Sequence, residues 1–397
     1  MVDADLPPRN NNAKGDAPMQ LADRAHVDPF IVMDVLREAN AAEAAGRSII
    51  HMEVGQPATP APATARAALR DGLENSALGY TEGLGLPALR EGIAGLYKRW
   101  YNLDLNPERV IVTAGSSAAF ILAFTALFEA GQRVGVCEPG YPSYRSILKA
   151  LSLTPVGLAT QDEDHHRLQP AALQDADIAG AIVASPNNPT GTMLDRAALA
   201  GLIAAMGDRA FISDEIYHGL EWGERAVSAL EITDEVYVIN SFSKYFSMTG
   251  WRVGWMVVPE THVRTLERLA QNLFICAPHA SQLAALGALQ GHTELLENRS
   301  VYEGNRTVLL EGLRAAGFTK IAPPDGAFYI YADVSEITGD SRAFAAEILA
   351  KAGVAVTPGL DFDPKRGGAT LRFSYAGSRA DMIEGAARLK AFMAARE

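Results

Sequence analysis

The sequence predicts an α/β fold in two domains, a large domain with a mostly parallel sheet flanked by helices and a smaller α+β domain. Five short β-rich segments alternate with helical ones, which is typical of βαβ units. They lie at residues 109–115, 133–139, 179–186, 209–215 and 236–243. The chain of 397 residues also exceeds what one hydrophobic core usually holds, so two domains are expected.

The two ends of the chain differ in pattern from its middle. Residues 21–45 carry apolar side chains at helical spacing, Gly46 stands where a helix would end, and a short strand is expected at 49–53. After about residue 290 a long charged helix is followed by two strand-like runs with a helix between them. We therefore expect a large domain at 60–290, a discontinuous small domain formed by 19–59 and 291–397, and a disordered lead at 1–18.

Composition and charge narrow the class of function. Lys and Arg total 35 against 47 Asp and Glu, and the resulting net charge of -12 opposes nonspecific binding to nucleic acid or to an anionic membrane. No apolar run approaches the length of about 18 residues that a membrane-spanning helix requires. The two cysteines, Cys137 and Cys276, form neither a disulfide framework nor a metal-ligand pattern. We expect a cytoplasmic protein without a metal site.

The segment 241–254, SFSKYFSMTGWRVG, carries the most chemical information. Its lysine, Lys244, follows a predicted strand between the hydroxyl groups of Ser241 and Ser243 and the later guanidinium of Arg252. This places an amine nucleophile beside donors that suit a phosphate, and burial together with nearby positive charge lowers a lysine pKa. The alternative is that Lys244 and Arg252 are solvated loop cations, as most such residues are.

Three other segments place polar groups at predicted strand ends or inside strands. A glycine and two serines, Ser116 and Ser117, begin a predicted helix, where backbone N–H groups bind anions, although an ordinary N-cap would look the same. Asp214 ends another predicted strand, and Tyr217 follows it by three residues. Arg372 interrupts an apolar strand-like run, where a charge is costly unless it is paired.

Several strings in order resemble the class I/II aminotransferases, which are pyridoxal-phosphate (PLP) enzymes of fold type I, the aspartate aminotransferase-like superfamily. They are the lysine segment, the turn SPNNPTG at 185–191, the pair Asp214 and Tyr217, and the run LRFSYA at 371–376. The resemblance spans about residues 20–395. It implies an aminotransferase that moves an amino group between an L-amino acid and a 2-oxo acid by a ping-pong mechanism, with PLP held by Lys244 as a Schiff base.

The resemblance also implies the parts of the cofactor site. Lys244 additionally moves the α-proton of the substrate, and Asp214 faces the pyridine nitrogen, with Glu215 as the competing carboxylate. The phosphate is bound by Ser116, Ser117, Ser241, Ser243 and Arg252, and the phenolic oxygen by Asn188 and Tyr217. Tyr141 matches the ring that stacks on the cofactor, although a buried structural tyrosine is the alternative.

Substrate contacts and a dimer follow from the same resemblance. Arg372, Gly55 and Asn188 match the residues that contact the substrate, with Arg372 clamping its α-carboxylate. Tyr80 resembles a tyrosine that crosses a homodimer interface to the phosphate of the partner site. No second arginine or lysine stands out as a partner for a distal carboxylate.

Two other functions remain compatible with the sequence. A β-eliminating lyase of the same fold would use Lys244, Asp214 and Arg372 equally well. The fold also serves as the effector-binding half of transcription regulators, which carry an N-terminal DNA-binding domain. The first 18 residues are too few to form such a domain.

Overall fold

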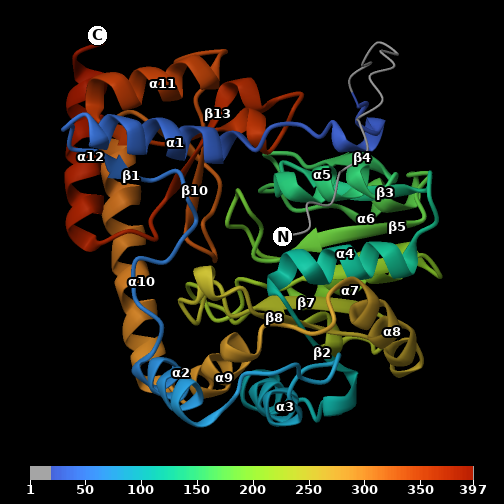
Figure 1. Cartoon of the computed structure of the whole chain (residues 1–397). Coiled ribbons are helices and arrows are strands. Elements are labelled where there is room, and N and C mark those ends of the chain that lie inside the picture. Colours follow the sequence, from blue (N-terminus) through green and yellow to red (C-terminus); the bar gives the residue numbers. More distant parts are fainter. Residues whose placement is uncertain (1–18, 397) are drawn as a thin grey trace, which may run out of the picture.

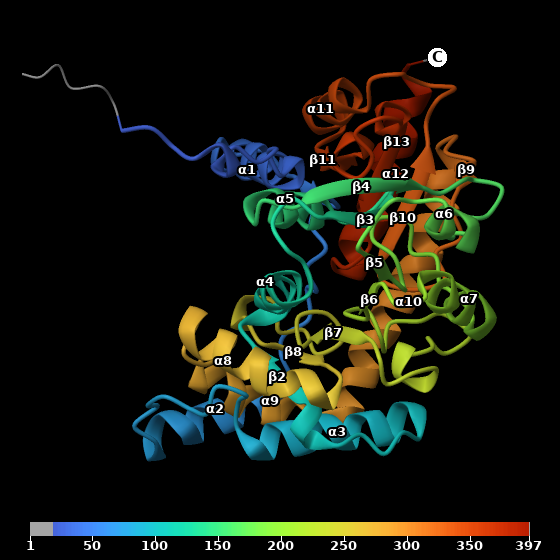
Figure 2. The same ribbon diagram turned by 90° about the vertical axis from the view of Figure 1, so that its right-hand side faces the viewer.

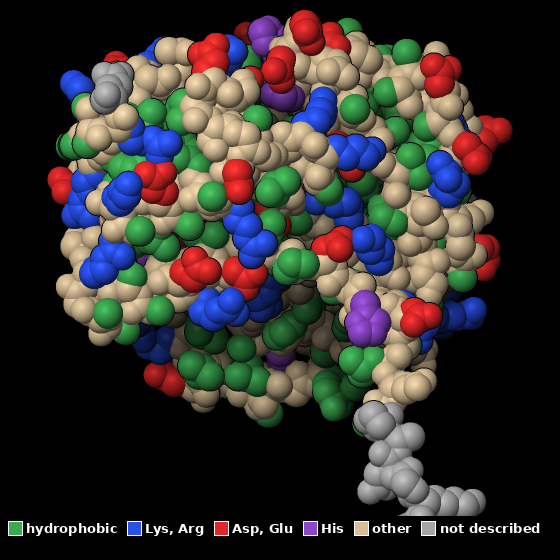
Figure 3. Space-filling model, turned by 90° about the horizontal axis from the view of Figure 1, so that it is seen from above, with side chains coloured by type: hydrophobic (Ala, Val, Ile, Leu, Met, Phe, Trp, Pro, Cys, Tyr) green, Lys and Arg blue, Asp and Glu red, His purple; other side chains and the backbone are tan. Residues whose placement is uncertain are grey.

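The structure is a computed structural model in which residues 19–396 are described (Figure 1). The disordered lead expected at 1–18 lies outside these residues. Within residues 19–396, none of the helices combines the length and hydrophobicity needed to traverse a lipid bilayer. On the face formed by α1, α5 and α11, acidic and basic side chains are interspersed (Figure 3).

A seven-stranded sheet confirms the predicted fold class. Its strands, in spatial order, are β2 (Val110–Thr113), β8 (Gly254–Val257), β7 (Tyr237–Ser241), β6 (Ala210–Asp214), β5 (Gly180–Ala184), β3 (Arg133–Glu138) and β4 (Thr154–Ala159). Strand β8 pairs antiparallel with both its neighbours, and the remaining pairs are parallel. The five predicted strands are all present, whereas β4 and β8 were not predicted.

Alternating side chains along the strands build a separate core on each face of this sheet. Ile111 packs into one cluster, while its neighbours Val110 and Val112 pack into the other, as the period of two in a strand requires. The first cluster lies under α4 (Gly115–Leu127), α5 (Pro142–Ala150) and α8 (Val263–Leu273). The second lies under α3 (Pro87–Tyr101), α6 (Pro170–Gln174) and α7 (Arg196–Met206) (Figure 2).

The C-terminal part of the chain contains an antiparallel sheet of β12 (Thr357–Pro358), β13 (Thr370–Ser374), β10 (Tyr329–Asp333) and β9 (Lys320–Ile321), in that order. The long helix α10 (His292–Ala315) packs against α12 (Arg379–Ala394), and α11 (Ser341–Ala352) lies beside them (Figure 1). Near the N-terminus, β1 (Ile50–His51) pairs parallel with β11 (Val354–Ala355). The division into domains at 59/60 and 290/291 stays a prediction.

The N-terminal helix is shorter than predicted. Helix α1 spans Ile31–Ala44, not residues 21–45, and it begins just after Pro29, whose ring removes one backbone donor. The carboxylate of Asp361 accepts hydrogen bonds from the N–H groups of Ile31 and Val32 at 3.0 and 3.2 Å. A residue 330 positions away therefore fixes where α1 starts. The strand expected at 49–53 is also reduced to the two residues of β1.

Helix α2 (Ala63–Asn75) packs against α9 (His279–Ala288) (Figure 1). This contact joins the region after β1 to the region after α8. Strands β5, β6 and β7 are parallel, so their carboxyl ends meet at one edge of the sheet. Ligands of open α/β sheets bind outside this edge. The predicted site segments follow these three strands directly.

Candidate active site

Lys244 lies just beyond the carboxyl end of β7, and its side chain is half-buried. Its Nζ donates a hydrogen bond to the carbonyl oxygen of Gly55 at 2.7 Å and lies 5.8 Å from the ring centres of Tyr217 and Phe328. Gly55 must lack a side chain, because a Cβ there would lie 1.7 Å from the hydroxyl of Tyr329. Residues that are far apart in the sequence thus surround the amine.

The surroundings of Lys244 favour the free amine. Burial, together with the positive charges of Arg372 and Arg252, lowers the pKa of Lys244 to about 8, while Asp214 acts in the opposite direction. A substantial fraction of this lysine is therefore unprotonated near pH 8. The lysine is suited to attack a carbonyl group and to accept a proton.

A set of hydrogen-bond donors suited to an anion lies beside the lysine. The Ser241 hydroxyl donates to the Ser243 hydroxyl at 2.8 Å and accepts from the Ser243 backbone N–H at 3.0 Å. The guanidinium of Arg252 lies against the first residue of α4, since a Cβ on Gly115 would come within 2.4 Å of Arg252 Nη2. Ser116 is half-buried at the same helix end. Serine hydroxyls, a guanidinium and a helix N-terminus therefore converge.

Two members of this predicted set face solvent. Ser117 and Arg252 are both exposed, and Arg252 Nη1 donates to the carbonyl oxygen of Thr249 at 2.9 Å. Arg252 also has a positive φ of 51°, a backbone conformation that a side chain rarely adopts. Strain of this kind is typical of functional positions.

Asp214 ends β6 and is buried. The Tyr144 hydroxyl donates a hydrogen bond to Asp214 Oδ2, and the Ile216 N–H donates to Oδ1 at 3.1 Å. Burial raises the pKa of Asp214 to about 6, although both hydrogen bonds and the charge of Lys244 lower it. Near neutral pH the group is therefore mostly a buried carboxylate.

Glu215, the competing carboxylate, has different partners from Asp214. Its Oε1 accepts hydrogen bonds from the hydroxyls of Ser213 and Ser228 at 3.1 Å each and from the Ala229 N–H at 2.8 Å. Burial raises the pKa of Glu215 to about 8, so at neutral pH it is mostly an uncharged acid. The two neighbours thus lie in separate networks, as alternation at a strand end predicts.

Arg372 on β13 is buried and contacts the loop that follows β5. Its Nη1 donates to Asn188 Oδ1 at 2.9 Å, and its Nη2 donates to the carbonyl oxygen of Glu53 and to the Thr357 hydroxyl. Arg372 Nε has no hydrogen-bond partner among residues 19–396. Such a donor is costly to bury, which indicates that this side chain is built to bind an anion.

Aromatic side chains line the space between Arg372 and the lysine. The guanidinium carbon of Arg372 lies 4.4 Å from the ring centre of Tyr329 and 4.7 Å from that of Phe362. The hydroxyls of Tyr217 and Tyr329 lie 2.8 Å apart. Tyr141 is half-buried, and its ring meets that of Tyr144 edge to face at 5.2 Å.

The structure brings most of the predicted site residues together, whereas Ser117 and Tyr80 are exposed. Tyr80 is 82% exposed, so within one chain it does not enter this site. Its predicted contact with a second subunit stays a prediction.

Three residues of the site were missed by sequence reasoning. Tyr144 lies three residues after Tyr141, on the first turn of α5, and this spacing was the available signal. Tyr329 and Phe362 gave no comparable signal, because neither residue belongs to a recognised string. Their role depends on contacts between segments that are far apart in the chain.

The fold and the site together define a class of protein, an α/β enzyme whose lysine amine lies beside an anion site and a buried carboxylate. A model of the family "aminotransferase class I and II" matches residues 47–389. The chain belongs to this family and is an aminotransferase of the aspartate aminotransferase-like fold.

Relatives with known names support this assignment. The valine–pyruvate aminotransferase of Mycobacterium tuberculosis is 42% identical over 384 residues, which cover 94% of this chain and 98% of the relative. A protein from Silicibacter pomeroyi whose crystal structure is known is 63% identical in sequence, with a TM-score of 0.91, and the match covers 95% of this chain and 100% of that one. The aspartate aminotransferase of Thermus thermophilus with maleate is 30% identical with a TM-score of 0.88, covering 94% and 100%.

Proposed function

We propose that this aminotransferase binds pyridoxal 5'-phosphate through the amine of Lys244 and uses it to transfer an amino group from an L-amino acid to a 2-oxo acid. The observation that carries the proposal is the convergence of three groups at one sheet edge. They are a half-buried lysine of lowered pKa, the anion-binding set around Arg252 and the buried carboxylate of Asp214.

The residues present fit each polar part of this cofactor. Ser241, Ser243, Arg252, Ser116 and Ser117 supply hydroxyl, guanidinium and helix N-terminal donors for the phosphate. Asp214 supplies a buried negative charge for the pyridine nitrogen. Asn188 and Tyr217 supply an amide and a phenol for the ring oxygen, and Tyr141 supplies an aromatic face. When bound, the cofactor accepts electron density from the substrate carbon that loses its proton.

Arg372 and Gly55 are suited to orient the amino acid. The unpaired Nε of Arg372 gives the guanidinium a free donor for the substrate α-carboxylate, and its Nη1 contact places Asn188 beside the same group. The Gly55 carbonyl accepts from Lys244, so Gly55 links the carboxylate site to the amine. Orientation of this kind holds the α-proton within reach of the lysine.

Lys244 then moves the proton. Its pKa of about 8 lies near the working pH of a cytoplasmic enzyme, which is favourable for a group that must accept a proton and return it. Asp214 maintains positive charge on the pyridine nitrogen, because a buried carboxylate stabilises a proton shared with a neighbouring base. Lys244 therefore acts at the α-proton of the substrate, and Asp214 acts at the pyridine nitrogen.

We propose that the substrate carries an apolar side chain. The rings of Tyr329 and Phe362 lie against Arg372, which favours an apolar substrate side chain over a charged one. The name of the valine–pyruvate relative is compatible with this preference. We also propose a homodimer with active sites shared through Tyr80, and a cytoplasmic location, which two free cysteines support.

A half-reaction experiment tests the proposed function. Purified holoenzyme is mixed with single amino acids, valine and aspartate among them, while the absorbance of the cofactor is recorded. Transamination predicts conversion to the amine form and its reversal when a 2-oxo acid is added. A β-eliminating lyase would instead release ammonia and a 2-oxo acid without accumulating that form. No spectral change with any amino acid would favour an effector-binding module.

A further inference from the structure

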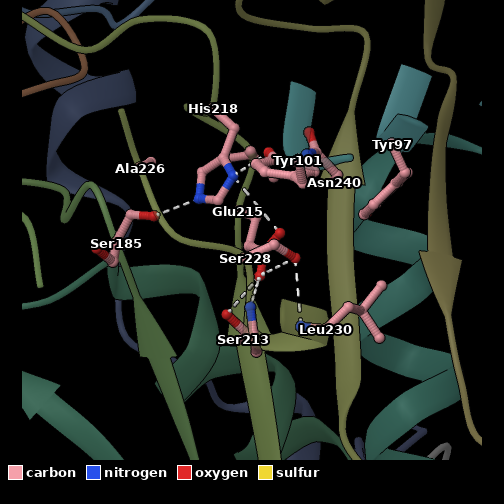
Figure 4. A network of polar contacts seen from close by, with 12 residues as sticks. Tyr97, Tyr101, Ser185, Ser213, Glu215, His218, Ala226, Ser228, Leu230 and Asn240 are labelled. Carbon is pink, nitrogen blue, oxygen red and sulfur yellow. Dashed lines mark hydrogen bonds and ion pairs between the residues drawn. The ribbon is translucent and has the colours of Figure 1, made fainter. Parts of the chain in front are cut away.

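A buried chain of hydrogen bonds lies behind the candidate active site. His218 follows Tyr217 directly and is 1% exposed. One ring nitrogen, Nε2, lies 2.9 Å from the carbonyl oxygen of Ser185, and the other, Nδ1, lies 2.5 Å from the hydroxyl of Tyr101 (Figure 4). Tyr101 is the last residue of α3, and Ser185 directly follows β5. The imidazole therefore connects three elements.

The partners of His218 fix its protonation. A carbonyl oxygen only accepts, so Nε2 carries the proton and donates to Ser185. Burial lowers the pKa of His218 to about 4, so the ring is neutral and Nδ1 accepts from Tyr101. The charged or titratable groups near this hydrogen-bond chain include Glu215, whose Oε2 lies 3.5 Å from Nδ1, and Arg225, whose guanidinium carbon lies 5.0 Å from the Tyr101 ring centre. Tyr97 and Glu221 also act on Tyr101. Glu231 pairs with Arg225.

Ser185 begins one segment with a predicted cofactor contact, and His218 ends another. Asn188 follows Ser185 by three residues, while Asp214 and Tyr217 precede His218. The Ser185 N–H also donates to the carbonyl oxygen of Asp214 at 3.2 Å. The two segments are thus joined once along the sheet and once through the imidazole.

We propose that His218 and Tyr101 are positioning residues that hold the Asn188 loop at a fixed distance from the Asp214–Tyr217 turn, so that Asn188 and Tyr217 reach the ring oxygen of the cofactor together. This inference rests on the proposed function. Neither residue touches the cofactor, and each acts through a backbone segment that it holds in place. Positioning of this kind requires that supporting groups be themselves locked by burial and hydrogen bonds.

The test measures the cofactor rather than turnover. Apoprotein carrying Tyr101→Phe, His218→Gln or His218→Phe is titrated with pyridoxal phosphate to obtain a dissociation constant. The absorbance of each loaded protein is then followed against pH. If Asn188 and Tyr217 are displaced, the ring oxygen of the cofactor loses two hydrogen-bond donors. The proton that this oxygen shares with the lysine nitrogen is then bound more tightly. The spectral midpoint then moves to higher pH.

A second tyrosine–histidine pair provides a matched control. The Tyr237 hydroxyl lies 3.0 Å from Nδ1 of His262, at the end of β7 opposite to Lys244. Tyr237→Phe therefore deletes the same kind of hydrogen bond without approaching the cofactor site. We expect it to leave both the dissociation constant and the spectral midpoint unchanged.

The expected losses follow from the bonds removed. Tyr101→Phe should weaken cofactor binding about fivefold, and His218→Phe, which leaves two buried groups unpaired, should weaken it about 30-fold. His218→Gln retains a donor for Ser185 and should recover part of this loss. Wild-type binding and an unshifted midpoint in Tyr101→Phe and His218→Gln would overturn the inference, and so would equal losses in Tyr237→Phe. Failure of the unaltered protein to bind pyridoxal phosphate would overturn the proposed function as well.

Discussion

Asp214 and Glu215 are neighbours in the chain, yet their carboxyl groups serve different networks. Asp214 bonds to Tyr144 and lies near Lys244, whereas Glu215 is held by Ser213, Ser228 and Ala229. One is mostly ionised and the other mostly protonated at neutral pH, because burial raises the pKa of Glu215 further. A role that needs a negative charge therefore belongs to Asp214.

This difference predicts opposite effects of two isosteric substitutions. Asp214→Asn removes the charge expected at the pyridine nitrogen and should slow the half-reaction on the order of 100-fold. Glu215→Gln replaces one uncharged group with another of the same shape and should keep most of the rate. Stopped-flow absorbance with a saturating amino acid measures both. A slower Glu215→Gln than Asp214→Asn would reverse the assignment.

The raised pKa of Asp214 also affects stability. In the folded apoprotein the pKa is about 6, above the value of 3.8 for an unperturbed aspartate, so the folded state binds more protons between these values. Stability contributed by this group is present below pH 3.8 and is lost as the pH rises through 6, by about 3 kcal/mol. Asp214→Asn should therefore gain relative stability at pH 7.5 compared with pH 4.5. Urea unfolding of the apoproteins measures this, and a pH-independent difference would contradict it.

The site residues that sequence reasoning found all belong to short local strings. Asp214 ends a strand, Lys244 and Asn188 each follow one, and a turn pattern marks each position. Tyr329 could not be found in this way, because its contacts with Arg372 and Gly55 join separate segments. The exposure of Ser117 and Arg252 could not be predicted from the sequence either, since it depends on how α4 packs.

The sequence predicts the buried strands better than it predicts the start of helix α1. The five predicted strands are buried apolar runs, and burial on both faces makes such runs easy to find. Strand β4 contains Pro155 and Gly157, which weaken a strand pattern, and β8 lies inside the lysine segment. The start of α1 depends on Asp361, a partner too distant for any local pattern.

The beginning of α4 provides a test at one helix end. Gly115 has a φ of +74°, and a Cβ there would collide with Arg252. Gly115→Ala should cost about 1 kcal/mol of stability through backbone strain and weaken cofactor binding about tenfold or more, because Arg252 is displaced. Calorimetry of apoprotein and cofactor titration measure the two effects.

Gly131→Ala is the matched control for this substitution. Gly131 has a similar φ of +87° and open space around it. The control should show the loss of stability without the loss of affinity. Equal affinities in both variants would remove Arg252 and the α4 terminus from the phosphate site.

Among residues 19–396 of one chain, Tyr80 is 82% exposed and does not enter the candidate active site. An exposed tyrosine in a glycine-rich connection is suited to a neighbouring subunit, and a two-fold dimer would place each Tyr80 beside the partner site. We expect Tyr80→Ala and Lys244→Ala to be nearly inactive when each is assembled alone. Co-refolded in equal amounts, they should recover about a quarter of the activity, since half of the dimers carry one intact site. No recovery in verified heterodimers would exclude a shared site.

Lys244 carries the whole account, and a covalent label tests it directly. Borohydride reduction of the holoenzyme fixes the bond between the cofactor and the amine that holds it, and peptide mapping then locates the pyridoxyl group. We predict one labelled peptide that contains Lys244. Lys244→Ala should abolish the label, while Lys149→Ala, at a half-exposed lysine paired with Asp28, should not. A label on another lysine in the unaltered protein would contradict the assignment of the active site.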